Sequence, residues 1–400
     1  MNEQPIHRRY VMIFAVACLA ILLPVLVLNY LLGLRSLGGV AVVLEASRWQ
    51  QETRGVTYAP PLSANRPFKS ARLFDRLPEI NAVVFGSSTA MSITQEMFPP
   101  GVSIYNFSQT GNVLATVVGE VEFLLQSQPA LKWFVVPFDW ALGSPYWPGE
   151  SRPQDLAPPQ PDSPGEDAVP ISQRLSDALS LPRVKNLAAI LGGVARASSS
   201  YQAFGEMFMQ NAGEPYRCSD GTPARDFDTI FRSTCTGFRY DGSATFANHE
   251  PLSPQRAQVL IASAVVPSSK YATALIKSGG EPNQRLLEQL AVGARVMRER
   301  GGALVLLLPP LLPGMDRALQ QALDTSKALA RTRQVLAQWA VAERVVVIDA
   351  GASERFGCAA NEFVDEHHAL PACYARVFAR LQDYWSHPAA FAPGLWAGKQ

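Results

Sequence analysis

The chain is poor in charge, in histidine and in cysteine for its 400 residues. Charged residues make up 17% of the sequence, and 35 lysines and arginines balance 34 aspartates and glutamates, so the net charge is +1. Such a balance excludes a polybasic nucleic-acid binder and an acidic disordered chain. The five histidines and five cysteines include no C-x-x-C or H-x-x-x-H spacing, so we expect no metal site.

An uncharged apolar run near the N-terminus predicts a membrane anchor. Residues 10–34 carry no charged side chain, and a run of about 25 residues crosses a bilayer core of roughly 30 Å. Arg8 and Arg9 precede the run, so the positive-inside rule places residues 1–9 in the cytoplasm and exports the rest of the chain. A buried core helix is the alternative, which the length of the run and its lack of charge disfavour.

The cysteines agree with export to an oxidising compartment. Cys18 lies inside the predicted anchor. The other cysteines form two pairs that are close in sequence, for which three connectivities exist. Proximity favours disulfides between Cys218 and Cys235 and between Cys358 and Cys373, each closing a short loop.

Short apolar runs alternate with helical patterns over residues 76–390, which predicts an α/β domain. We expect strands at 81–85, 103–107, 132–136, 303–308 and 345–348, and helices at 112–126, 285–300, 316–342 and 371–385. The first of these helices would have Asn112 as its N-cap, and the pattern at 316–342 fits one long helix or two shorter ones. Such alternation forms a parallel sheet covered by helices on both faces, in three α/β/α layers.

Two segments do not follow this alternation. Residues 35–75 mix apolar and polar residues with Gly and Pro, and we interpret them as a juxtamembrane stalk. Residues at about 140–280 are interpreted as an insertion packed beside or over the sheet. The insertion would contain a proline-rich extended loop at 144–170 and a helical stretch at 171–213.

A serine follows the first predicted strand, in the sequence Gly86-Ser87-Ser88-Thr89. A serine at a strand-to-helix turn is well placed as a nucleophile, because the helix N-terminus supplies N–H groups for a developing oxyanion. The alternative is that Ser88 only caps the helix.

Two further polar segments would complete a serine hydrolase site. Residues 106–112 (NFSQTGN) follow the second strand, and Gly111 allows its backbone N–H to face a cleft. Asp365 precedes His368 by three residues, so its carboxylate reaches the imidazole Nδ1–H and leaves Nε2 to take a proton from serine. Ordinary loop and surface-turn roles are the alternatives, and His367 is a competing base.

The order of these segments resembles the SGNH, or GDSL-like, hydrolase superfamily, over residues 78–140 and 300–385. The resemblance implies the SGNH fold and a site that needs no cofactor. It also implies that Ser88 is the nucleophile, that Asp365 and His368 form its dyad, and that the backbone N–H groups of Ser88 and Gly111 form the oxyanion hole. In this chain Ser87 replaces the usual Asp of the G-D-S motif.

The chain departs from the third motif of the family, G-x-N-D. Asp139 matches the Asp, but Phe138 stands where the family has an Asn that donates to the oxyanion. The side chains of Asn112, Asp139 and His367 are further candidates for substrate binding. Tyr240-Asp241-Gly242 in the insertion could line an acceptor groove, with an ordinary surface turn as the alternative.

The anchor, the G-S-S sequence and the large insertion are similar to a membrane-anchored subset of the superfamily that works at the bacterial envelope. This resemblance implies a serine O-acyltransferase or carbohydrate esterase of the inner (cytoplasmic) membrane, with its catalytic domain on the periplasmic side. Its partners would be a cell-envelope or secreted glycan and a membrane-bound O-acyltransferase. A catalytically inactive scaffold or glycan-binding protein of a polysaccharide assembly system is the alternative.

Overall fold

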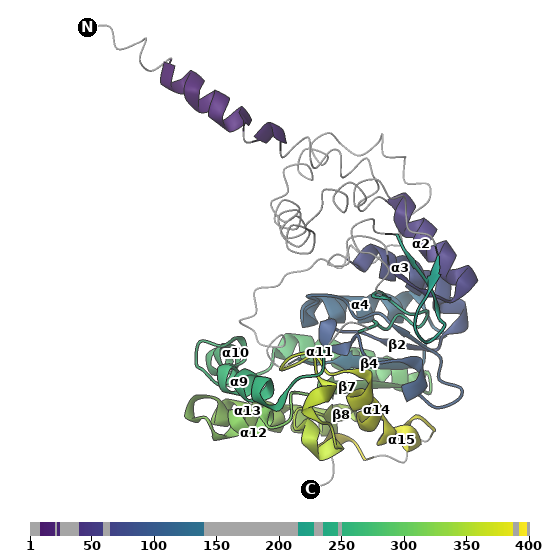
Figure 1. Ribbon diagram of the computed structural model, residues 1–400. Helices are drawn as coiled ribbons and strands as arrows, with labels where there is room; N and C mark the ends of the chain where they lie inside the picture. Colours follow the sequence, from purple (N-terminus) through teal and green to yellow (C-terminus); the bar gives the residue numbers. More distant parts are fainter. Residues whose placement is uncertain are drawn as a thin grey trace.

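The computed structural model describes residues 9–20, 22–24, 40–58, 65–139, 215–227, 235–246, 250–386 and 392–397. At its centre lies a parallel six-stranded sheet in the order β3-β2-β4-β7-β8-β9 (Figure 1). The strands are β2 (Ala82–Val84), β3 (Ile104–Asn106), β4 (Trp133–Pro137), β7 (Ala303–Leu308), β8 (Val346–Asp349) and β9 (Gly394–Trp396). All residues of the first five are buried, which explains why these strands are mostly apolar in the sequence.

The α/β class and the five predicted strands are confirmed, but β9 was not predicted. This edge strand is half-buried and pairs with β8 alone, so it has no apolar run to mark it. Its position extends the folded domain beyond residue 390, the predicted end.

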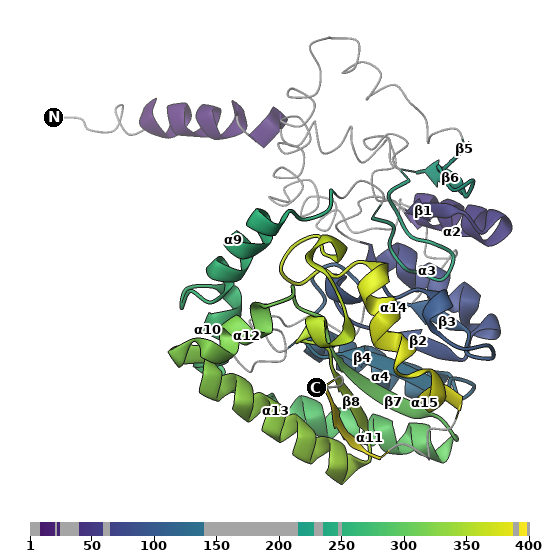
Figure 2. The same cartoon turned by 60° about the horizontal axis from the view of Figure 1, so that its bottom comes forward.

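Helices cover both faces of the sheet (Figure 2). On one face α4 (Leu114–Ser127), α11 (Gln284–Glu299) and α13 (Leu323–Glu343) pack side by side. On the other lie α14 (Pro371–Ala379) and α15 (Gln382–Ser386), where Phe378 and Trp385 pack on Phe98 from the loop between β2 and β3.

Three predicted helix boundaries need correction or refinement. The pattern at 316–342 is two helices, α12 (Met315–Gln321) and α13, because Ala322 between them is extended. The single helix predicted at 371–385 is also two, since α14 ends at Ala379 before α15 begins. Helix α4 has Val113 rather than Asn112 as its N-cap.

The predicted stalk at 35–75 is wrong for its described residues. They form α2 (Val40–Thr53), β1 (Val56–Tyr58) and α3 (Arg66–Arg76). A second apolar cluster joins α2 and α3 to the insertion; its members are Val43, Ala46, Trp49, Phe68, Ala71, Met91, Phe227, Phe238 and Ala244. The folded domain therefore begins near residue 40 rather than at residue 76.

The described part of the insertion lies between β4 and β7 along the chain. Strands β5 (Tyr216–Arg217) and β6 (Pro223–Asp226) form a small sheet with β1, and α9 (Pro254–Ala264) and α10 (Lys270–Ser278) pack on α12 and α13. The predicted proline-rich loop and the helical stretch at 171–213 lie outside the described residues.

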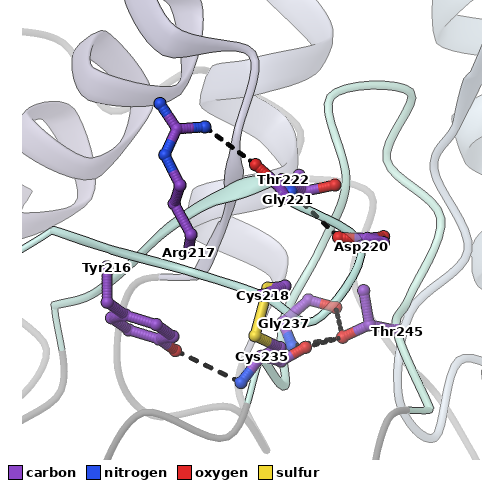
Figure 3. The surroundings of a disulfide bond; sticks show 9 residues. All are labelled: Tyr216, Arg217, Cys218, Asp220, Gly221, Thr222, Cys235, Gly237 and Thr245. Carbon is purple, nitrogen blue, oxygen red and sulfur yellow. Dashed lines mark hydrogen bonds between the residues drawn. A yellow bond between two sulfur atoms is a disulfide. The ribbon is translucent and has the colours of Figure 1, made fainter.

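Both predicted disulfides are confirmed. Cys218 and Cys235 have Cα atoms 5.7 Å apart, and the Tyr216 hydroxyl accepts the Cys235 N–H (Figure 3). Cys358 and Cys373, at a Cα–Cα distance of 5.0 Å, join the segment after β8 to α14.

The predicted anchor at 10–34 is described only in part. Residues 9–20 and 22–24 are helical, and apolar side chains such as Tyr10, Ile13 and Leu19 are exposed. Within the described residues, no helix has the length and apolar character needed to cross a bilayer.

Candidate active site

The topology of the sheet marks one point where ligands are expected to bind. The chain passes from β2 to its neighbour β3 on one side, and then returns to β4 on the other side of β2. At such a switch point the loops leave in opposite directions and open a crevice beyond the carboxyl ends of the strands. Ser88 follows β2 and Asp139 follows β4, so both lie at this point.

The turn after β2 frees the hydroxyl of Ser88. Gly86 has φ +118°, and a Cβ there would lie 2.8 Å from the Pro137 ring, so β4 can approach this turn only at a glycine. A short 3-10 turn over Ser88–Ala90 follows, at the point where we expected a strand-to-helix turn. Its N-cap is Ser87, whose Oγ accepts the Thr89 N–H. The capping role considered for Ser88 therefore belongs to Ser87.

A tight loop presents the predicted dyad. Phe363 and Ala369 pair as an antiparallel bridge, and the Val364 N–H donates to the His368 carbonyl oxygen. The Asp365 Oδ1 accepts the backbone N–H groups of His367 and His368, at 3.0 and 2.9 Å. The backbone of the loop therefore fixes the position of the Asp365 carboxylate without the help of another side chain.

The structure brings Ser88, His368 and Asp365 together in one hydrogen-bonded chain. His368 Nε2 lies 2.8 Å from Ser88 Oγ, and His368 Nδ1 lies 2.7 Å from Asp365 Oδ2. All three side chains are half-buried, so a substrate can reach them. In this arrangement the carboxylate orients the imidazole, and Nε2 can take the serine proton as a general base.

Hydrogen bonding keeps Asp365 ionised. Burial raises the pKa of this carboxyl, but the hydrogen bond and charge of His368, the charge of His367 and a backbone N–H outweigh burial and hold the pKa well below its usual range. A carboxylate that stays ionised at neutral pH can stabilise an imidazolium at His368.

His367 is not the histidine bonded to Ser88. Its Nδ1 lies 3.3 Å from Glu366 Oε1 and 3.4 Å from Asp365 Oδ1. Burial lowers the pKa of His367, but these carboxylates and Asp139 raise it overall. Asp365, His367 and His368 also offer ligand atoms within 4.8 Å of one another, a group that no short metal motif in the sequence indicates. Both ring nitrogens of His368 are engaged in the chain to Ser88, so a metal would compete with that chain.

The loop after β3 places Gly111 near the switch point. Asn106 donates to the carbonyl oxygens of Ala90 and Ile93, both at 2.8 Å, and its Oδ1 accepts the Ser108 N–H. Gly111 is exposed with φ +69°. Among the described residues, no hydrogen bond takes up the backbone N–H of Gly111 or of Ser88. Neither N–H is therefore taken up by another described group.

The candidate residues Asn112 and Asp139 line a small pocket beside Ser88. Its lining is Gly86, Ser87, Thr89, Asn112, Leu114, Val117, Pro137 and Asp139. Phe138 is buried and supplies no donor there. The Asn112 amide donates to the Glu120 carboxylate, at 3.3 and 3.2 Å, and its Oδ1 accepts from Arg66 at 3.1 Å. As a third oxyanion donor, Asn112 would have to give up its bond to Glu120.

Arg66 and Glu120 were missed from the sequence. Glu120 lies on the buried face of α4, between Val117 and Leu124. A carboxylate at helical spacing among apolar residues was the signal that could have found it, because such a group needs a buried partner.

The Cys358–Cys373 disulfide closes the segment that carries the dyad, and its loss should destabilise the fold. Closing a loop with a sequence separation of 15 is expected to contribute about 3 kcal/mol. We expect Cys358→Ser with Cys373→Ser to lower the free energy of unfolding by about that amount in urea titrations of the full chain followed by tryptophan fluorescence. Cys18→Ser, which removes the unpaired cysteine, is the control and should leave the midpoint unchanged. A double variant as stable as the parent would contradict this.

Comparison of the chain with models of protein families, with curated proteins and with solved structures finds no match in any of the three.

Proposed function

We propose that the chain is a membrane-anchored SGNH-like serine acyltransferase or esterase acting on O-acyl groups of an extracellular or cell-envelope polysaccharide. The observation that carries the proposal is the hydrogen-bonded chain from Asp365 through His368 to Ser88 Oγ. The proposal is supported by the position of these three side chains at the switch point of a parallel sheet, where ligands of such sheets bind.

In the proposed reaction Ser88 Oγ attacks the acyl carbonyl carbon, and its proton passes to His368 Nε2. The negative charge that develops on the carbonyl oxygen is stabilised by the N–H groups of Ser88 and Gly111. His368 then returns the proton to the leaving sugar oxygen as the C–O bond breaks, which leaves acyl-Ser88. A second sugar hydroxyl or a water, deprotonated by His368, then attacks the acyl carbon, and His368 returns this proton to Ser88 Oγ as the bond between Oγ and the acyl group breaks.

Location and partners belong to the same proposal. The exposed apolar side chains of residues 10–20, 22 and 23 support an anchor in the bacterial inner membrane. The two disulfides support a catalytic domain on the oxidising, periplasmic side. There a glycan would be the acceptor or substrate, and a membrane-bound O-acyltransferase would deliver the acyl group.

Two observations favour the alternative, an inactive scaffold that binds glycan. Phe138 is buried at the position where the family has its oxyanion-binding Asn, and the Asn112 amide is held by Glu120. Losing one donor can lower kcat about 10²–10³-fold.

Covalent labelling separates the two functions. We expect the full chain in detergent micelles to react with a fluorophosphonate probe, because the general base His368 activates Ser88. Ser88→Ala should abolish the label and His368→Ala should nearly do so, while Ser87→Ala, which removes the neighbouring hydroxyl, should still be labelled. Mass spectrometry of the labelled peptide identifies the serine. A folded parent chain that takes up no probe, or a label on another residue, would favour the scaffold.

A further inference from the structure

The oxyanion loop, residues 108–112, is fastened by hydrogen bonds at its two ends. At its start the Ser108 N–H bonds to Asn106 Oδ1, and the Gln109 N–H donates to the Gly86 carbonyl oxygen at 2.9 Å. Thr110 and Gly111 are exposed, and a Cβ on Gly111 would meet nothing within 4 Å. The position of the Gly111 N–H therefore depends on the two ends of the loop.

The far end is fastened by a closed triangle of side chains. Arg66 Nη1 lies 2.7 Å from Glu120 Oε1, Arg66 Nη2 donates to Asn112 Oδ1 at 3.1 Å, and the Asn112 amide donates to Glu120. Glu120 and Asn112 are buried, and the Arg66 side chain is 19% exposed. Each of the three side chains is bonded to the other two. Only this arrangement of the triangle leaves none of its buried polar groups without a partner.

Burial makes the triangle sensitive to the loss of one member. Burial raises the pKa of Glu120 to about 7, against the opposing effects of Arg66, Asn112 and Lys69. Without Arg66 this carboxylate keeps only the Asn112 amide as a direct partner among the described contacts, and Asn112 loses the donor to its Oδ1. Breaking a buried ion pair on one side leaves an uncompensated group that rearranges its neighbours.

We propose that Arg66 and Glu120 are positioning residues, which hold Asn112 and through it set the Gly111 N–H in the oxyanion hole. The inference rests on the proposed function. It gives α3, a helix of the segment that follows the predicted anchor, a direct role at the site. Asn65 of the same turn adds a longer contact to Thr110 Oγ1, at 3.5 Å.

The same helix offers a matched control. Arg72 is fully buried in α3, but it faces α2, where it donates to Gln50, Gln51 and Ser47. Removing Arg72 should destabilise the packing of α2 on α3 without touching residues 108–112. A merely structural role for Arg66 predicts the same result for both arginines.

The test measures two properties of the full chain in detergent micelles. In Arg66→Met we expect the second-order rate of fluorophosphonate labelling to fall about 10–100-fold, less than the loss of a whole oxyanion donor. Arg66→Lys and Glu120→Gln should give smaller losses, and Arg72→Met should stay within about threefold. Hydrogen exchange of peptides covering residues 108–112 should accelerate in Arg66→Met and not in Arg72→Met.

Either of two results would overturn the inference: parent-like labelling and exchange in Arg66→Met, or equal changes in Arg66→Met and Arg72→Met. A parent chain that takes up no label would instead contradict the proposed function. The exchange measurement still decides in that event whether Arg66 holds the loop, since it needs no chemistry at Ser88.

Discussion

Replacing Asp365 by asparagine is expected to lower kcat for ester hydrolysis about 10⁴-fold while the chain stays folded. Asp365 Oδ1 accepts two backbone N–H groups, so the new side chain keeps its oxygen on them and turns its NH₂ group towards His368 Nδ1. Nδ1 must then accept a hydrogen bond, which moves the imidazole proton to Nε2. A protonated Nε2 cannot take the proton of Ser88, so the general base is lost.

The neighbouring carboxylate provides the control for this prediction. Glu366 lies in the same loop and contacts His367, while the chain to Ser88 runs through Asp365. Glu366→Gln should therefore change kcat by no more than a few-fold. The measurement is steady-state hydrolysis of p-nitrophenyl acetate by the full chain in micelles, with circular dichroism to check the fold. An Asp365→Asn variant within tenfold of the parent, or equal losses in both variants, would contradict the assigned role of Asp365.

Much of the fold could be predicted because its buried strands are short apolar runs. Strands covered on both faces cannot alternate polar and apolar residues, so 81–85 and 303–308 are visible in the sequence without any knowledge of their partners. Two of the three polar segments of the site, at Ser88 and at residues 106–112, could be found for a related reason, because polar residues directly after buried strands meet at one edge of a parallel sheet. The third could be found only from the spacing of Asp365 and His368.

The rest depends on contacts that are distant in sequence. The mixture of apolar and polar residues with Gly and Pro at 35–75 is interpreted as a stalk, yet the side chains of Lys69 and Arg72 in this segment are buried. Lys69 Nζ donates to the Gly242 carbonyl oxygen at 2.6 Å and lies 4.6 Å from the centre of the Phe238 ring. Burial lowers the pKa of Lys69 to about 7, against the charges of Asp241 and Glu120. The sequence around Lys69 does not indicate partners such as Gly242 and Phe238, which lie more than a hundred residues away.

A second large effect, on stability, is expected from a substitution at Gly242. The sequence left two interpretations of its turn open, the lining of an acceptor groove and an ordinary surface turn. Asp241 and Gly242 are buried, and the Asp241 carbonyl oxygen accepts the Asn106 N–H at 2.7 Å. Gly242 has φ +81°, and a Cβ there would overlap the Asn106 carbonyl oxygen and lie 2.9 Å from the Tyr105 ring. We expect Gly242→Ala to lower the free energy of unfolding by about 2–5 kcal/mol, the sum of a left-handed backbone and overpacking.

Gly221 is the matched control, because it has φ +83° in the same insertion but open space around its Cβ position. Gly221→Ala should cost only the backbone conformation, about 1–2 kcal/mol. Urea titrations of both variants measure the difference, which isolates the overlap with β3. Because Asn106 also binds Ser108, Gly242→Ala should slow fluorophosphonate labelling, and Gly221→Ala should not. Equal stability losses in the two variants would mean that the turn relaxes away from β3, and that the insertion does not support the oxyanion loop.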